Sequence, residues 1–491
     1  MSYKKHHEQF VSGNDGTTPL HIAVVGIACI MPVYLRDSIY TLLSKSQKDR
    51  LENSIWLSVL MDFFLVILPV ELMLTGLSDF GPHCLFAMVL SLWILINIQL
   101  SKPKIKKAKT NLAVSEIPMG NRRPFITYYR AYANLITAVS ILAVDFKIYP
   151  RVFAKTETFG TSVMDVGVGG FLIANAIVSP EARGMVSSDS ILSSIWKSIK
   201  SSLPLVVIGM VRVVAVKALG YQEVVTEYGV HWNFFFTLAA VKIGCTLLFC
   251  SISPRLWSIV GVLTIALYQH SLTYDGLKEY IIKGADGKGG RTDIIDANRE
   301  GLFSCLGFFS IYIMGVQLGK IIMRKREKVI DWIKLCITLV VMSTAFLVMM
   351  YYCGKHVEKV SRRFANLAYL LWVVAFNSLL MLAFLMFDIA LFILNHVTRL
   401  SRKQESPDGK DTAEVAPISE GYRTCDLISA ISYNGLFYFM FANLLTGLVN
   451  MSMKTIYQSN VVAYLVVTFY MLILSVVSTL LYKRKLCLKF W

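Results

Sequence analysis

The chain has 491 residues, of which 55% are hydrophobic and 16% are charged, and its mean hydropathy is +0.56. A globular domain carries about 25% charged residues, so this composition excludes a water-soluble protein and predicts one polytopic domain in a lipid bilayer. The net charge of +17 fits the excess of Lys and Arg in cytosolic loops of multi-span proteins, so we expect no nucleic-acid partner. The nine cysteines include no CxxC pair, and we expect no metal site.

Apolar runs long enough to cross a hydrocarbon core of about 30 Å recur along the whole chain. They predict an all-α polytopic membrane bundle of about 13 transmembrane helices. The expected spans are 20–36, 55–75, 84–100, 125–145, 160–179, 203–219, 231–251, 256–273, 301–319, 333–352, 366–394, 428–450 and 461–482.

Around these spans the sequence predicts three regions. Residues 1–19 form a polar N-terminal tail, in which His6 and His7 are expected to be solvated. Residues 20–482 form the transmembrane domain, with a flexible polar loop at 399–427. Residues 483–491 form a basic C-terminal tail.

Four clusters of Lys and Arg predict the orientation of the bundle. They follow the third, ninth, eleventh and thirteenth expected spans, so all four fall on one side; the clusters lie at 102–109, 324–328, 399–403 and 483–485. The positive-inside rule makes that side cytosolic. The C-terminus is then cytosolic and the N-terminus lies on the opposite side.

The loops on the opposite side hold most of the polar groups that solubility does not require; these loops are 146–159, 220–230, 274–300 and 353–365. The segment Leu142–Asp165 is the richest of them. Asp145 stands where the fourth span should end, Pro150 breaks any continuation of the helix, and Lys155 follows on a short loop. We interpret this segment as the rim of an active site. The alternative is an interfacial loop with ordinary solvated charges.

Ionisable residues inside apolar spans are costly and usually face a cavity or a partner; the candidates are Asp62, Arg130, Asp145, Asp165, Arg212, Lys217 and Asp388. Arg130 and Asp145 are 15 positions apart on one span, about 22 Å along a helix, so they cannot pair. Arg212 lies in the middle of its span, and we expect a buried partner or an anionic ligand for it.

Glu227 and His231 are four positions apart. If the seventh span begins near Tyr228, both lie on its first turn, where the carboxylate could orient the imidazole as a base. The alternative is a satisfied interfacial histidine. The sequence contains no P-loop and no GxSxG motif, so an enzyme of this kind would transfer a group directly between two substrates.

Several motifs, taken together and in order, resemble one family. They are FITYYR (Phe125–Arg130), the long motif Leu142–Phe171, Tyr221–Thr237, ANREG (Ala297–Gly301), SRRFANL (Ser361–Leu367) and TGLVNMS (Thr446–Ser452). They resemble the glucosaminyl-phosphatidylinositol acyltransferase family, which is PIG-W in animals and the GPI-anchored wall transfer protein in fungi.

The resemblance implies a multi-pass enzyme of the endoplasmic reticulum membrane. Such an enzyme transfers a palmitoyl group from acyl-CoA to the inositol 2-hydroxyl of glucosaminyl-phosphatidylinositol, an early step of GPI-anchor biosynthesis. Palmitoyl-CoA is then a co-substrate, and no prosthetic group is implied. The N-terminus and the catalytic motifs would face the lumen.

The resemblance also places the family's catalytic pair on Asp145 and Lys155. A sugar hydroxyl is a poor nucleophile and needs a base, which we assign to Asp145. Lys155 would stabilise the negative charge that develops on the thioester oxygen; the two roles could be exchanged, or relayed through His231. Further substrate contacts are expected from Arg151, Glu157, Thr161, Asp165, Arg212, Glu227, His231, Asn233, Arg299 and Arg362.

The family commonly has FPIFPRRFAK where this chain has FKIYPRVFAK, and Val224 also departs from its pattern. The effect of Lys147 and Val152 on rate or loop rigidity stays open. Two other readings are a multi-pass lipid transporter and a non-catalytic membrane scaffold. The sequence shows no internal repeat of the kind on which many transporters are built.

Overall fold

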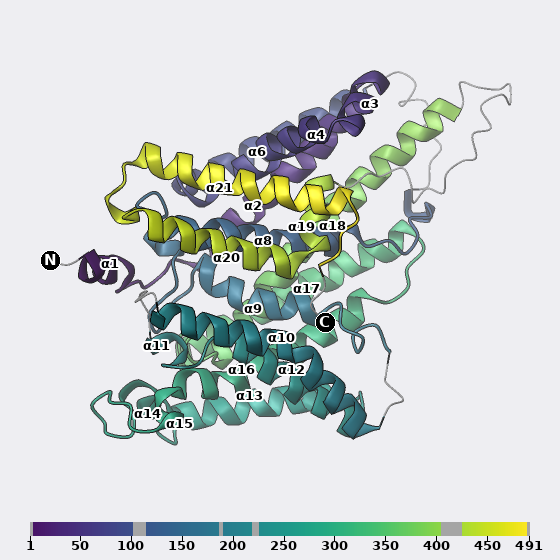
Figure 1. The fold of residues 1–491 in the computed structure, drawn as a ribbon. Helices are drawn as coiled ribbons and strands as arrows, with labels where there is room; N and C mark the ends of the chain where they lie inside the picture. The colour runs from purple at the N-terminus through teal and green to yellow at the C-terminus, as the bar shows by residue number, and fades with distance from the viewer. Residues whose placement is uncertain (1–2, 102–113, 186–189, 219–224, 404–424, 489–491) are drawn as a thin grey trace.

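The computed structural model describes residues 3–101, 114–185, 190–218, 225–403 and 425–488. These residues form α-helices with two isolated β-bridges, which confirms the prediction of an all-α polytopic bundle (Figure 1). Within them, 10 helical segments are long and apolar enough to cross a membrane. The remaining three expected spans correspond to helices α8, α9 and α13, of which α9 has 14 residues and α13 has 17.

The first half of the chain contains helices α1 (Tyr3–Val11), α2 (Pro19–Leu42), α3 (Lys45–Asn53), α4 (Ile55–Asp62), α5 (Leu68–Leu74), α6 (Gly81–Leu100), α8 (Pro124–Ala143), α9 (Val163–Ala176) and α10 (Ile191–Ala218). The second half contains α11 (Val225–Tyr228), α12 (Phe234–Ser251), α13 (Trp257–Thr273), α14 (Leu277–Lys283), α15 (Ile294–Ala297), α16 (Arg299–Ile322), α17 (Val329–His356), α18 (Leu367–Lys403), α19 (Asp426–Tyr433), α20 (Gly435–Ser452) and α21 (Asn460–Lys483). A π-helical segment, Phe63–Ile67, joins α4 to α5.

Polar caps explain why several helices begin where they do. The side chain of Thr18 accepts a hydrogen bond from the His21 amide immediately before Pro19, at the start of α2. Ser162 caps α9 and Ser459 caps α21 in the same way. Such side chains satisfy amide groups that have no partner within the helix. The twelfth expected span is interrupted at Asn434, so it forms two helices, α19 and α20.

Helices α2 and α18 form the interior of the bundle. The most apolar 18-residue window of each is 72% buried, whereas the corresponding windows of α6, α10 and α20 are only 11% buried. A helix that is apolar all round and buried belongs to the core, and an apolar helix with an exposed surface faces lipid in a membrane protein. The peripheral helices therefore supply the lipid-facing surface.

One end of the bundle collects α1, α11, α14 and α15, on the left in Figure 1. The loop before α9 meets the loop before α18 there, because the Gly160 amide donates to the Val360 carbonyl at 2.8 Å. The basic segment 324–328 follows α16 at its other end, where the Met119 amide donates to the Glu327 carbonyl at 2.8 Å. The polar loops and this basic segment thus lie at opposite ends of the bundle, as the sequence predicted.

Candidate active site

The loop between α8 and α9 forms the centre of the candidate site. It begins with a turn in which the Asp145 amide donates to the Leu142 carbonyl at 3.2 Å. Pro150 then precedes a short 3₁₀ helix, Arg151–Phe153. Ser162 ends the loop and caps α9, which places Asp165 in the first turn of that helix. Helix geometry and capping thus bring several ionisable side chains to one end of the bundle.

Four of these side chains form a continuous chain of ion pairs. The Lys155 Nζ lies 2.7 Å from Glu227 Oε1, and Arg362 Nη1 lies 3.3 Å from the same oxygen. Arg362 Nε lies 2.6 Å from Asp165 Oδ1. The Lys155 end is 36% exposed, whereas the Asp165 side chain is fully buried. Two cations and two carboxylates balance, so the four side chains together carry no net charge.

Asp165 is the fixed end of this chain. Its carboxylate accepts hydrogen bonds from the Thr156 amide at 3.1 Å and from the Thr156 hydroxyl at 2.7 Å. Its backbone carbonyl accepts a hydrogen bond from the Tyr369 hydroxyl at 2.7 Å. A buried carboxylate needs such donors because its desolvation is costly. Asp165 therefore fixes Arg362, which in turn holds Glu227.

The ion pairs change the pKa values of the side chains that form them. Burial raises the pKa of Glu227, but the positive charges of Lys155 and Arg362 outweigh it and bring the pKa to about 2. Burial lowers the pKa of Lys155, and Glu227 opposes that effect. Burial also lowers the pKa of Arg362, but Glu227 and Asp165 raise it further than burial lowers it. Glu227 is therefore ionised throughout the neutral range.

Asp145 has different partners. Its side chain is 8% exposed, Asn450 Nδ2 donates to its Oδ2 at 2.7 Å, and His7 Nε2 lies 3.6 Å from its Oδ1. Asn450 belongs to α20 and His7 to α1. Among the contacts of the described residues, Asp145 and Lys155 are not paired with each other. The two proposed catalytic groups thus lie on one loop but are held by different elements.

The N-terminal segment packs onto this loop. Asn14 Nδ2 donates to the Ala154 carbonyl at 2.6 Å and to the Lys155 carbonyl at 3.2 Å. The Gly13 amide donates to the Glu157 carboxylate at 3.2 Å, and Thr161 exchanges hydrogen bonds with the backbone of Thr17. In the structure, Glu157 and Thr161 therefore hold the N-terminal segment.

The prediction that His6 and His7 are solvated is confirmed for His6, which is exposed, and is wrong for His7, which is partly buried. His6 Nδ1 lies 2.9 Å from the Tyr457 hydroxyl, and His7 approaches Asp145. A polar composition suggested a free tail, but the segment instead supplies hydrogen-bonding groups to a loop that has few regular backbone partners of its own. Gly160 makes the close approach possible: its φ is +131°, and a Cβ there would meet the Asp15 carbonyl oxygen at 2.2 Å.

The prediction that Glu227 and His231 share one helical turn is wrong. Glu227 lies on α11, whereas α12 begins only at Phe234. Gly229 separates them with a φ of +121°, a value that favours glycine. His231 is exposed, and its amide donates to the Asn298 side chain at 2.8 Å.

The remaining predicted contacts have local roles in the structure. Asn233 caps α12, and its amide group also donates to the Gly209 carbonyl at 2.9 Å. Arg151 donates to the Val144 carbonyl at 2.7 Å within the same loop. Arg212, for which the sequence predicted a buried partner or an anionic ligand, is exposed, and its charge contributes to the low pKa of Glu227.

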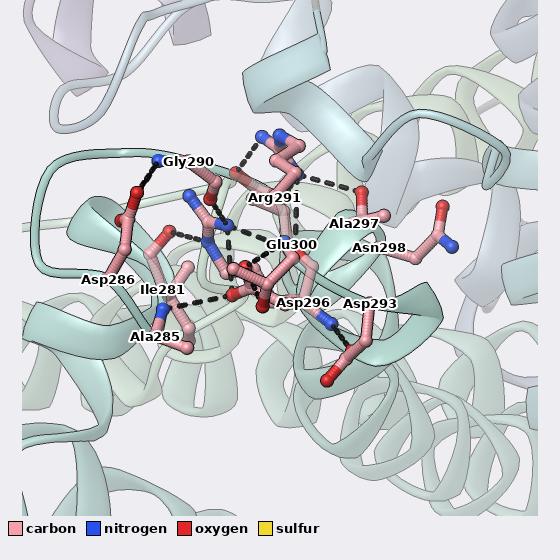
Figure 2. A network of polar contacts seen from close by, with 12 residues as sticks. Ile281, Ala285, Asp286, Gly290, Arg291, Asp293, Asp296, Ala297, Asn298 and Glu300 are labelled. Atoms are coloured by element: carbon pink, nitrogen blue, oxygen red, sulfur yellow. Dashed lines mark hydrogen bonds and ion pairs between the residues drawn. The ribbon is translucent and has the colours of Figure 1, made fainter.

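Arg299 belongs to a second network, around the loop between α14 and α16. Its guanidinium donates to the carbonyls of Ile281 at 3.0 Å and Gly290 at 2.9 Å. Figure 2 shows Arg291 beside Glu300, which lie 2.8 Å apart. Arg363 lies 3.2 Å from the same carboxylate. Because Arg362 and Arg363 are adjacent, this network supports the loop that positions Arg362.

Asn450, His7, Asn14 and Glu300 were not predicted as site residues. Asn450 belongs to the motif TGLVNMS (Thr446–Ser452), which carried the resemblance to the family. Its polarity next to an apolar span was the available signal. In the described part of the chain, no three His, Cys, Asp or Glu side chains are grouped as a metal site requires.

The sequence profile of the GWT1 family matches residues 3–481. The chain belongs to the GWT1 family. It is 36% identical over 509 residues to glucosaminyl-phosphatidylinositol-acyltransferase PIGW of Bos taurus and 34% identical over 516 residues to that of Homo sapiens, with 100% of both chains covered in each case. GPI-anchored wall transfer protein 1 of Aspergillus oryzae is 35% identical over 519 residues, which cover 97% of each chain. The family predicted from the motifs is confirmed.

Three departures from the GWT1 family motif, at Lys147, Tyr149 and Val152, can now be located. Lys147 and Val152 are both exposed, so neither substitution changes the packing beneath the loop. Tyr149 is 1% exposed, and its hydroxyl donates to Ser140 at 3.1 Å. Val224 lies outside the described residues.

Proposed function

We propose that this protein transfers a palmitoyl group from acyl-CoA to the inositol 2-hydroxyl of glucosaminyl-phosphatidylinositol, an early step of GPI-anchor biosynthesis. The observation that carries this proposal is similarity along the entire chain to proteins named as acyltransferases of that lipid. The site agrees with the chemistry, because one loop presents a carboxylate and a partly exposed ammonium group.

In the proposed reaction Asp145 acts as the general base. It takes the proton of the inositol hydroxyl while the oxygen attacks the thioester carbonyl. The tetrahedral intermediate then collapses, the C–S bond breaks, and the leaving thiolate of coenzyme A takes the proton that Asp145 had accepted, which regenerates the carboxylate. This sequence needs no covalent acyl-enzyme, which fits a site that presents a carboxylate and an ammonium group.

Lys155 would stabilise the oxyanion of that intermediate. Its Nζ is the exposed end of the ion-pair chain, so it can turn toward a substrate while Glu227 keeps it charged. Arg362 and Asp165 then act as its support. Arg212, which is exposed and electrostatically close to Glu227, is a candidate for the lipid phosphate. Direct substrate contacts of Arg151, Glu157, Thr161, His231, Asn233 and Arg299 stay predictions.

We place the protein in the endoplasmic reticulum membrane, with the N-terminus and the candidate site on the lumenal side and the C-terminus in the cytosol. The support is the positive-inside rule and the separation of the polar loops from the basic segment 324–328 along α16.

The test uses microsomes from cells that lack their own inositol acyltransferase. The chain, or its Asp145→Asn and Lys155→Ala variants, is expressed at matched levels and supplied with labelled palmitoyl-CoA and glucosaminyl-phosphatidylinositol. Acylated lipid from the parent chain and none from the variants is expected. A folded parent chain that yields no product would overturn the proposal. Product from both variants would support the proposed reaction but show that the catalytic residues lie elsewhere. Lipid movement across the membrane without acylation would instead favour a transporter.

A further inference from the structure

We infer that Asn450 is a positioning residue for Asp145, which holds one carboxylate oxygen so that the other is presented for proton transfer. The inference rests on the proposed acyl transfer. Asn450 lies 305 positions after Asp145, near the end of α20. It touches no reacting atom in this scheme and acts through the base.

The geometry separates the two oxygens of Asp145. Asn450 Nδ2 donates to Oδ2 at 2.7 Å, a short contact typical of a hydrogen bond to an ionised acceptor. His7 Nε2 lies 3.6 Å from Oδ1, which is too long for a hydrogen bond. Oδ1 is therefore the oxygen with capacity to accept a proton from a hydroxyl that enters the site.

A carboxylate at this place needs an external support. Asp145 follows the last turn of α8, and the terminal torsion of an aspartate side chain is broad. Its loop has no regular backbone ladder to fix it, and only 8% of the side chain is exposed to solvent. The amide of Asn450 supplies a donor without adding a charge, so it orients the carboxylate and still leaves it basic.

This arrangement predicts a specific kinetic signature. A hydrogen bond to the ionised form favours that form. Replacing Asn450 by leucine removes the donor at similar volume, so a higher pH is needed to ionise the base. In the pH profile of kcat/KM, the acidic limb should shift to higher pH by about one unit. At neutral pH, kcat/KM should fall by about 10- to 100-fold.

The experiment measures kcat/KM for labelled palmitoyl-CoA between pH 5 and 9 in microsomes that contain the full chain. The variants are Asn450→Leu, Asn450→Gln, which keeps the amide donor, and the matched control Asn443→Leu. Asn443 lies two turns earlier on α20, and its amide donates to the Phe439 carbonyl of the same helix at 2.7 Å. The control therefore removes the same group from the same helix without touching Asp145.

The inference is supported if the acidic limb of the kcat/KM profile shifts to higher pH in Asn450→Leu but stays at its parent position in Asn450→Gln and Asn443→Leu. A lower rate with the parent limb in Asn450→Leu overturns it, because a merely structural role lowers the amount of active protein without moving the limb. If leucine prevents folding, Asn450→Ser, which shortens the side chain, is judged by the same two criteria. An inactive parent chain overturns the proposed function instead, so the two failures are distinct.

Discussion

The Lys155 ammonium group lies 2.7 Å from the carboxylate of Glu227, a residue of α11. Glu227 in turn accepts from Arg362. A lysine that is to stabilise an oxyanion must stay protonated in a site where burial lowers its pKa. The Glu227 carboxylate favours the protonated form of Lys155. Glu227 itself is held by Arg362, which lies far from both residues in the sequence.

Glu227→Gln should lower activity and move the alkaline limb of the rate profile to lower pH. Without the carboxylate, burial and the nearby Arg362 both lower the pKa of Lys155, so its charge is lost sooner as pH rises. We expect a loss of about 10²-fold, measured as acyl transfer between pH 6 and 10. Glu279→Gln, at an exposed site on α14, is the control. An unchanged alkaline limb would show that Lys155 does not act as the titrating cation.

Arg362→Met should destabilise the folded chain by about 3–5 kcal/mol, because it leaves the buried carboxylate of Asp165 without the cation that pairs with it. The Arg362 side chain is 3% exposed and contacts both Asp165 and Glu227. Arg362→Lys should be only a partial replacement, since an ammonium group cannot reproduce the two-sided guanidinium contact. Thermal unfolding in detergent, followed by tryptophan fluorescence, measures the effect. Lys334→Met, at an exposed ion pair, should change little; an equal loss there would refute the explanation.

Stability should fall as pH drops from about 4.5 toward 2. The pKa of Glu227 is about 2 in the folded chain and 4.5 ordinarily, so its contribution is fully present above the ordinary value and is lost as pH falls through the folded value. The contribution is at most roughly 3 kcal/mol, and less because the partly exposed Lys155 is screened. Acid unfolding of the parent chain and of Glu227→Gln would be compared. Equal pH dependence in both would contradict the prediction.

Asn14→Ala should loosen the loop between α8 and α9, which carries the candidate site. It removes the donor to the carbonyls of Ala154 and Lys155, and a lost hydrogen bond to a partly buried carbonyl costs about 1–3 kcal/mol locally. We expect faster protease cleavage within 146–160 and lower acyl transfer, with membrane insertion unchanged. Ser12→Ala is the control, since within the described part of the chain its hydroxyl donates a hydrogen bond only to the nearby Gln9 carbonyl, at 3.3 Å. Parent-like cleavage of Asn14→Ala would remove the proposed role of the N-terminal segment.

The spans were predictable because membrane insertion acts on run length, and every expected apolar run became helical. The end of the bundle that carries the site was also predictable, from loop charge. The error at Glu227 and His231 came from one assumption about where a helix begins. Asn233, immediately before three phenylalanines, was the overlooked cap signal, and Gly229 was the overlooked break.

The partners of Asp145 could not be predicted from spacing. Asn450 and His7 reach it from helices at the two ends of the chain, and only the packing of α20 and α1 around the loop brings them close. Local patterns report which face of a helix is apolar, but they carry no information about which distant loop a single amide will meet.

The contact between Asp145 and Asn450 also has a consequence for how the protein is made. Translation proceeds at about 5–20 residues per second, so the 305 residues between the two take about 15–60 s to synthesise. Throughout that interval Asp145 has already reached the membrane-insertion machinery, but Asn450, its amide donor, has not yet been synthesised. If Asp145 is the base, as we propose, a ribosome that stops before α20 would release a chain with most of its helices inserted and a carboxylate that is not yet oriented, so catalytic competence would be acquired only near the end of translation.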